Sequence, residues 1–112
     1  MLRRLPTPTT SGRFDLAPQV VLKRSVADLN RNLGAEFHDG ADDLNRYQAA
    51  FFRVGNRVCA LIHYDGEPQT TVTIYLERGL SVEDIENDTA EIMRELALSH
   101  DSIVWKEDAT AR

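Results

Sequence analysis

The sequence lacks the features of several specialised classes of protein. It has one cysteine, which cannot form an intrachain disulfide, and we therefore expect a reducing, cytoplasmic location. Its longest apolar run, Val58–Ile62, has five residues, whereas a membrane helix needs ~20. None of the six glycines belongs to a phosphate-binding loop, and no Gly-x-Ser-x-Gly elbow occurs. We identify no family from these motifs, and we expect no membrane association and no cofactor.

Positive charge is scarce in the last third of the chain. Residues 1–80 carry ten Lys and Arg against nine Asp and Glu, a balance of +1. Residues 81–112 carry three against nine, a balance of −6. Because this acidity repels nucleic-acid phosphates, we expect no nucleic-acid partner. The acidic stretch is interpreted either as a solvated helix face or as a docking surface for a basic partner.

What the sequence does contain is the composition of one globular domain. Its 112 residues are 42% hydrophobic and 28% charged, which suffices for a single core and argues against disorder over most of the chain. Residues 1–12 are rich in Pro, Thr, Ser and Gly without an apolar period, which predicts a flexible N-terminal tail. We assign residues 13–108 to a single α+β domain and residues 109–112 to a frayed C-terminus.

Hydrophobic periodicity predicts two helices. The first is expected over residues 16–33, where apolar residues recur at helical spacing. The β-prone sequence Val20–Leu22 leaves an alternative, a short strand followed by a shorter helix that begins near Ser25. The second helix is acidic and begins at Ser81, whose surroundings resemble a capping box; we expect it to end near Leu98.

Three apolar runs between these helices are separated by turn signals, which predicts antiparallel hairpins. The runs are Tyr47–Val54, Arg57–Tyr64 and Gln69–Glu77, and Ile103–Trp105 is expected to form a final strand. A helical crossover returns the chain in the same direction, so the final strand should run parallel to the third run. The order α-β-β-β-α-β predicts a two-layer α+β sandwich, in which two helices cover one face of a mainly antiparallel four-stranded sheet.

The register of the hairpins decides which side chains share a face. In the second hairpin we expect Ile62 opposite Val72 and Arg57 opposite Glu77, which gathers aliphatic side chains on the helix side. In the first hairpin, a three-residue bulged turn keeps the apolar residues on one side. A two-residue turn at Gly55–Asn56 would swap the faces of the first strand, and the sequence leaves this choice open.

The sheet face away from the helices is the candidate functional surface. With the bulged turn, this face gathers a mainly apolar and aromatic set of residues: Tyr47, Phe51, Leu61, His63, Thr73 and Tyr75. An apolar patch with a polar rim often marks an interaction site. We therefore expect a homodimer, or a complex with another protein, formed through this face. Alternatively, the polar connection of residues 38–46 or the N-terminal arm folds over it.

Few residues suit catalysis or metal binding. Cys59 and His63 are four strand positions apart, about 13 Å, which is too far for a thiol–imidazole pair. His38 and the aspartates after it match neither zinc nor calcium spacing, so we expect no metal site. The sequence favours a small non-enzymatic protein-interaction module. The competing hypothesis is a ligand-binding or catalytic domain that uses the sheet face around His63 and Tyr75.

Overall fold

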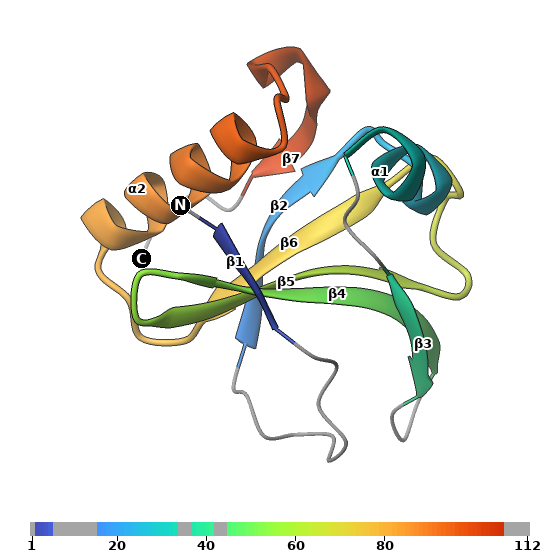
Figure 1. Cartoon of the computed structure of the whole chain (residues 1–112), viewed down its shortest axis with the longest axis horizontal. Helices are drawn as coiled ribbons and strands as arrows, with labels where there is room; N and C mark the ends of the chain where they lie inside the picture. Colours follow the sequence, from blue (N-terminus) through green and yellow to red (C-terminus); the bar gives the residue numbers. More distant parts are fainter. Residues whose placement is uncertain (1, 6–15, 34–36, 42–44, 107–112) are drawn as a thin grey trace.

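The computed structural model describes residues 2–5, 16–33, 37–41 and 45–106 (Figure 1). Its elements, in chain order, are β1 (Leu2–Leu5), β2 (Leu16–Leu22), α1 (Val26–Leu33), β3 (His38–Ala41), β4 (Arg46–Val54), β5 (Arg57–Tyr64), β6 (Val72–Glu77), α2 (Val82–Glu95), the 3-10 turn η1 (His100–Ser102) and β7 (Ile103–Lys106). The α+β class is confirmed.

The described strands form one sheet of seven strands, in which each pair of neighbours is antiparallel. The order is β1-β4-β5-β6-β2-β7, and β3 also pairs with β4. The prediction of four strands is therefore wrong. Residues 2–5, expected in a flexible tail, instead pair with residues 51–54 of β4. β3 pairs with residues 46–49, so the predicted polar connection supplies an edge strand.

The predicted helix over residues 16–33 is wrong, and the alternative is confirmed. The segment forms β2 and then the shorter helix α1. The backbone of β2 pairs with β6 and β7 on its two sides, and its Val20 and Leu22 side chains are fully buried in the cluster that the helices cover. The helix is capped by Ser25, whose Oγ accepts a hydrogen bond of 3.0 Å from the backbone N–H of Asp28.

The last strand runs in the predicted direction but has a different neighbour. β2 is antiparallel to both β6 and β7, so β6 and β7 are parallel to each other. β6 and β7 do not pair with each other, because β2 lies between them in the sheet. The crossover through α2 therefore spans an inserted strand that comes from the beginning of the chain (Figure 1).

The first hairpin has the two-residue turn that the sequence left as an alternative. Val54 pairs with Arg57, and Gly55 has a φ of +59°. A type II′ hairpin turn requires a positive φ at this first turn position, which glycine adopts without strain. The bulged turn is thus wrong.

The central strand β5 is turned over relative to the prediction. Phe52 of β4 and Leu76 of β6 both lie opposite Cys59, whereas the expected registers placed both opposite Val58. Each hairpin therefore differs by one residue, and the two differences leave β4 and β6 aligned with each other as predicted. Because side chains alternate along a strand, only β5 exchanges its two faces.

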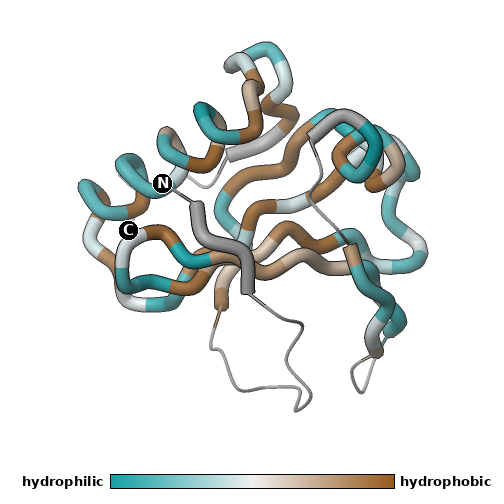
Figure 2. Tube along the Cα trace, viewed as in Figure 1, coloured by the Kyte–Doolittle hydropathy of each residue, from teal (hydrophilic) through white to brown (hydrophobic). Residues whose placement is uncertain are grey.

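Both helices pack on one face of the sheet, as predicted. Leu29 of α1 and Ile92 of α2 belong to the same buried cluster as Leu61 and Ile74 of the sheet. Hydrophobic residues follow the central strands and polar residues line the outer side of α2 (Figure 2). This cluster is the main core, and the opposite face of the sheet carries a second one.

Candidate functional site

The sheet face away from the helices carries a compact group of apolar and aromatic side chains, which we call the tyrosine face. Its buried members are Ala49, Phe51, Ala60 and Ile62, and its partly buried members are Leu16, Tyr47, Tyr64 and Tyr75. They come from β2, β4, β5 and β6. The three tyrosines accompany a small apolar centre of one phenylalanine and three aliphatic residues, and none of the eight residues is charged. The face therefore combines an apolar centre with amphipathic rings at its margin.

Tyr47 is held in place by two neighbours. It pairs with Tyr64 across β4 and β5, and the two rings meet edge to face with centroids 5.5 Å apart and planes at 66°. On its other side Tyr47 lies over Gly40 of β3, its cross-strand partner. A Cβ at position 40 would lie 2.5 Å from Cε1 of Tyr47, so any larger residue would displace the ring. Edge-to-face packing and the missing side chain together fix the position of this tyrosine.

The structure separates the six residues that the sequence predicted for this surface. By register, Tyr47, Phe51, Thr73 and Tyr75 lie on the face away from the helices. Leu61 lies on the opposite face, 1% exposed in the main core. His63 shares that opposite face, 7% exposed, and its Nδ1 is 2.8 Å from the carbonyl oxygen of Thr71.

Because the faces of β5 are exchanged relative to the prediction, the side chain of Arg57 lies on the helix side of the sheet and contacts α2. Its Nε and one terminal nitrogen each donate a 2.7 Å hydrogen bond to a different carboxylate oxygen of Asp88, which is buried. The expected pair with Glu77 is replaced, and Glu77 accepts a hydrogen bond from the backbone N–H of Val58. The bidentate geometry is the strong form of an ion pair, and it joins the first hairpin to the helix layer.

Cys59, two residues after Arg57 on β5, is buried in the main core. Burial raises the pKa of its thiol from the ordinary 9.0 to about 12, and the nearby charge of Asp88 acts in the same direction. A thiolate is the reactive form of cysteine, so this thiol is suppressed as a nucleophile. Cys59 therefore acts as a small apolar core residue.

Of the four residues considered for metal binding, the structure describes two. His38 and Asp39 are exposed on β3, and Asp42 and Asp43 lie outside the described residues. Over residues 2–5, 16–33, 37–41 and 45–106, no three His, Cys, Asp or Glu side chains come together as a possible metal site. None of the helices in these ranges has both the length and the apolar character needed to cross a membrane.

Sequence reasoning missed Tyr64 and Gly40 at this surface. Tyr64 is the last residue of β5. Because the two faces of β5 are exchanged relative to the prediction, its side chain lies on the tyrosine face. Gly40 was interpreted as a loop residue, although a glycine opposite an aromatic residue is a recognisable cross-strand pair.

The chain was also compared with known proteins: no protein-family model matches it, no curated protein matches it and no solved structure matches it.

Proposed function

We propose that this chain is a small, non-enzymatic, cytoplasmic protein-interaction module that forms a homodimer through the tyrosine face. The observation that carries the proposal is the set of three partly exposed tyrosines, at positions 47, 64 and 75, which lie around an uncharged apolar centre that is itself buried within the chain. Interface cores are depleted in charge and enriched in aromatic residues, and homodimer interfaces are the more apolar class. Tyrosine suits such a surface because its ring is apolar and its hydroxyl tolerates water.

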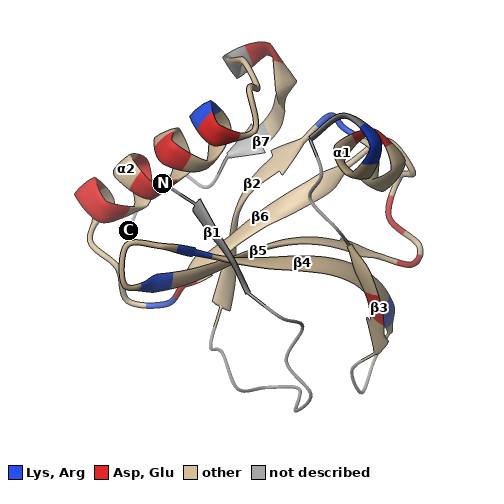
Figure 3. Ribbon diagram, viewed as in Figure 1, with Lys and Arg blue, Asp and Glu red and all other residues tan. Residues whose placement is uncertain are grey.

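The distribution of charge favours a second copy on this face. Acidic residues gather on α2, whereas the middle of the sheet is free of charged residues (Figure 3). Two copies of a chain with a net charge of −5 repel each other, most strongly where their acidic helices would meet. Contact between tyrosine faces keeps the α2 helices on the outside of the pair, which reduces this repulsion.

The competing hypothesis placed a ligand or catalytic site around His63 and Tyr75. These residues lie on opposite faces of the sheet, and the Nδ1 of His63 already contacts a backbone carbonyl oxygen. The shared face on which that hypothesis depends is therefore missing. The tyrosine face contains three of the six predicted residues, Tyr47, Phe51 and Tyr75, and Thr73 lies on the same side of the sheet, which supports the interaction module instead.

Sedimentation at several concentrations tests the proposal. The wild type is expected to dimerise as its concentration rises. Tyr75→Glu should shift the protein to monomer, because an unpaired carboxylate in an apolar contact is strongly unfavourable. Ala90→Glu is the matched control, since it adds the same charge at an exposed position of α2 and should leave the dimer intact.

Circular dichroism of each variant separates dissociation from unfolding. A folded monomeric Tyr75→Glu variant supports the proposal, because Tyr75 lies outside the main core of Ile74 and Leu76. A wild type that stays monomeric at all concentrations contradicts it without reference to any variant. If Tyr75→Glu remains dimeric while folded, the interface lies elsewhere.

A further inference from the structure

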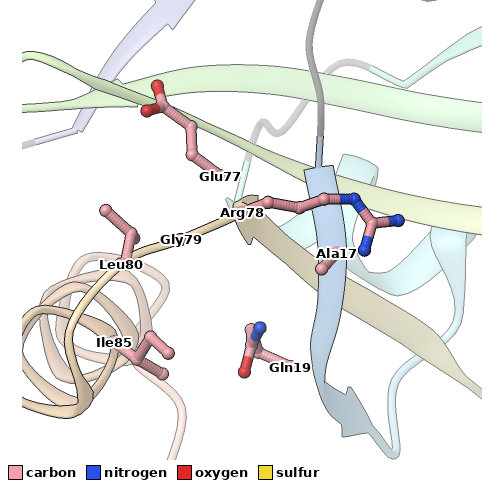
Figure 4. Close-up of a pocket in the computed structure, with 7 residues that line it drawn as sticks. All are labelled: Ala17, Gln19, Glu77, Arg78, Gly79, Leu80 and Ile85. Carbon is pink, nitrogen blue, oxygen red and sulfur yellow. The ribbon is translucent and has the colours of Figure 1, made fainter.

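A bulge in β2 turns a polar side chain toward the helix layer. The register between β2 and β6 shifts between Pro18 and Val20, which leaves Gln19 as an extra residue. A bulge interrupts the alternation of side chains along a strand and often re-aims one of them near a functional site. The side chain of Gln19 accordingly reaches from β2 toward Ile85 of α2 (Figure 4).

Gln19 lines a pocket between β2, the β6–α2 connection and the first turn of α2 (Figure 4). The pocket has a volume of about 270 Å³. The connection leaves open space here, because a Cβ built on Gly79 would meet no atom of the described residues within 4 Å, apart from its two chain neighbours. The lining residues are Ala17, Gln19, Glu77, Arg78, Gly79, Leu80 and Ile85.

The amide of Gln19 has one covered end and one open end. The residue is 3% exposed, and its Oε1 atom is buried without a hydrogen-bond partner among the described residues. In Figure 4 the amide nitrogen is turned to the open space beside Leu80, and the oxygen is turned away from it. None of the residues that the structure describes accepts a hydrogen bond from this nitrogen. The side chain therefore offers the pocket an N–H donor and no acceptor.

The charged residues of the lining are directed elsewhere. The carboxylate of Glu77 accepts a hydrogen bond from the backbone N–H of Val58. Arg78 extends across β2 and makes an interaction of its own (Figure 4). An ion in the pocket would have no counter-charge facing it, which makes its transfer from water unfavourable. The walls around the amide nitrogen are apolar and come from Ala17, Leu80 and Ile85.

We propose that this pocket binds a small uncharged molecule with a short apolar body and a carbonyl oxygen that accepts a hydrogen bond from the amide nitrogen of Gln19. The volume lies just below the ~300–1,000 Å³ of sites for drug-sized ligands, so the occupant has few atoms. The donor sets the specificity, because a buried polar group discriminates against ligands that leave it unpaired. The pocket is on the opposite side of the sheet from Tyr75 and does not depend on the proposed dimer.

Heteronuclear NMR titration of the full chain with four probes of similar size tests the proposal. Cyclopentanone has a carbonyl acceptor, methylenecyclopentane has the same shape without one, pyrrole has a donor instead, and cyclopentanecarboxylate carries a charge. Cyclopentanone should shift the side-chain amide protons of Gln19 downfield and should shift the backbone amides of Gly79 and Leu80, all in a saturable manner. We expect the other three probes to bind at least about tenfold more weakly.

Three variants locate the binding. Gln19→Met keeps an unbranched side chain but removes the donor, so it should abolish the preference for cyclopentanone over methylenecyclopentane. Gln69→Met is the matched control, since it makes the same exchange at an exposed position outside the pocket and should leave binding unchanged. Ala17→Leu fills part of the pocket while Gln19 stays in place, and should weaken the binding of cyclopentanone.

The comparison of the four probes on the wild type decides the matter even if a variant does not fold. The proposal is overturned if cyclopentanone shifts none of these amides at millimolar concentration, which would leave water as the occupant of the pocket. It is also overturned if any other probe binds as tightly as cyclopentanone, since the nitrogen of Gln19 would then not select the ligand. An unchanged preference in a folded Gln19→Met variant would place the binding elsewhere.

Discussion

Cys59 shows how a single buried side chain links pH to stability. Its thiol has a folded pKa of about 12 against an ordinary value of 9.0, so folding favours the protonated form. This contribution is complete below pH 9 and is lost as the pH rises from 9 towards 12. Above pH 9 the free energy of unfolding should therefore fall by up to about 1.4 kcal/mol per pH unit on account of this group.

Comparison of the wild type with Cys59→Ala isolates this effect from the titration of other groups. Urea unfolding at pH 7, 9, 10 and 11 should show that the stability advantage of the wild type is constant to pH 9 and shrinks above it. An advantage that stays constant to pH 11 would show that the thiol of Cys59 ionises in the folded state as easily as in the unfolded one.

At the scale of secondary structure, the C-terminal end of α2 has a strained backbone conformation at Ala97. The N–H of Leu98 donates to the carbonyl of Met93 at 2.9 Å, and the N–H of Ala97 donates to Arg94 at 3.1 Å. These bonds define a Schellman motif, in which the residue after the cap is left-handed and is usually glycine. Ala97 occupies this position with a φ of +56°, where its Cβ is unfavourable.

Ala97→Gly should therefore raise the free energy of unfolding by roughly 0.5–1 kcal/mol, the relief of strain outweighing the added flexibility of the unfolded chain. Ala90→Gly, at an exposed position inside the same helix, provides the opposite control and should lower stability by about 1 kcal/mol. Thermal or urea unfolding measures both. Equal losses for the two variants would mean that Ala97 is not left-handed in solution.

The two helix beginnings illustrate what sequence can predict. Ser81 accepts a hydrogen bond of 3.1 Å from the N–H of Asp84, as the capping pattern indicated. Ser25 and Asp28 repeat the same Ser-x-x-Asp spacing and the same bond. Hydrophobic spacing from Leu22 onward obscured this second signal, because the last residues of a buried strand happened to continue the period of the helix.

The central strand shows where sequence prediction ends. Val58–Ile62 is apolar at every position, so alternation cannot tell which of its faces meets the helices. β6 has one clearly aliphatic face, and its predicted orientation is confirmed, whereas β4 carries Ala and Phe on both faces and the sequence left its orientation open.

The candidate surface was accordingly predictable at Tyr75. Tyr47 was placed there through a turn that is wrong, and its position is right only because the register of the second hairpin differs by one residue as well. The placement of Leu61 and His63 on β5 was wrong. Gln19 was unpredictable because a bulge depends on pairing with β6, which the local sequence does not encode.

For the molecule as a whole, the position of β2 determines the order in which the fold can be completed. β2 pairs with residues 72–77 and with residues 103–106, both far away in the chain. Pairings between such distant segments are slow to form, because a long loop must close first. Until both partner strands are available, β2 cannot take its place in the sheet, and the apolar side chains of Val20 and Leu22, which are buried in the folded chain, stay exposed to solvent.

During synthesis, β2 is made early and must wait for most of the chain. β4, β5 and β6 can pair with their sequence neighbours as they emerge, but β2 requires β6 on one side and β7 on the other. Ribosome-bound chains of increasing length should therefore stay sensitive to protease within residues 16–22 until β7 has emerged. Protection of this segment in chains that end before residue 100 would show that β6 alone holds it. A nascent chain with an exposed β-prone strand is prone to aggregate, so the inserted strand lengthens the period in which this chain is exposed to aggregation during its synthesis.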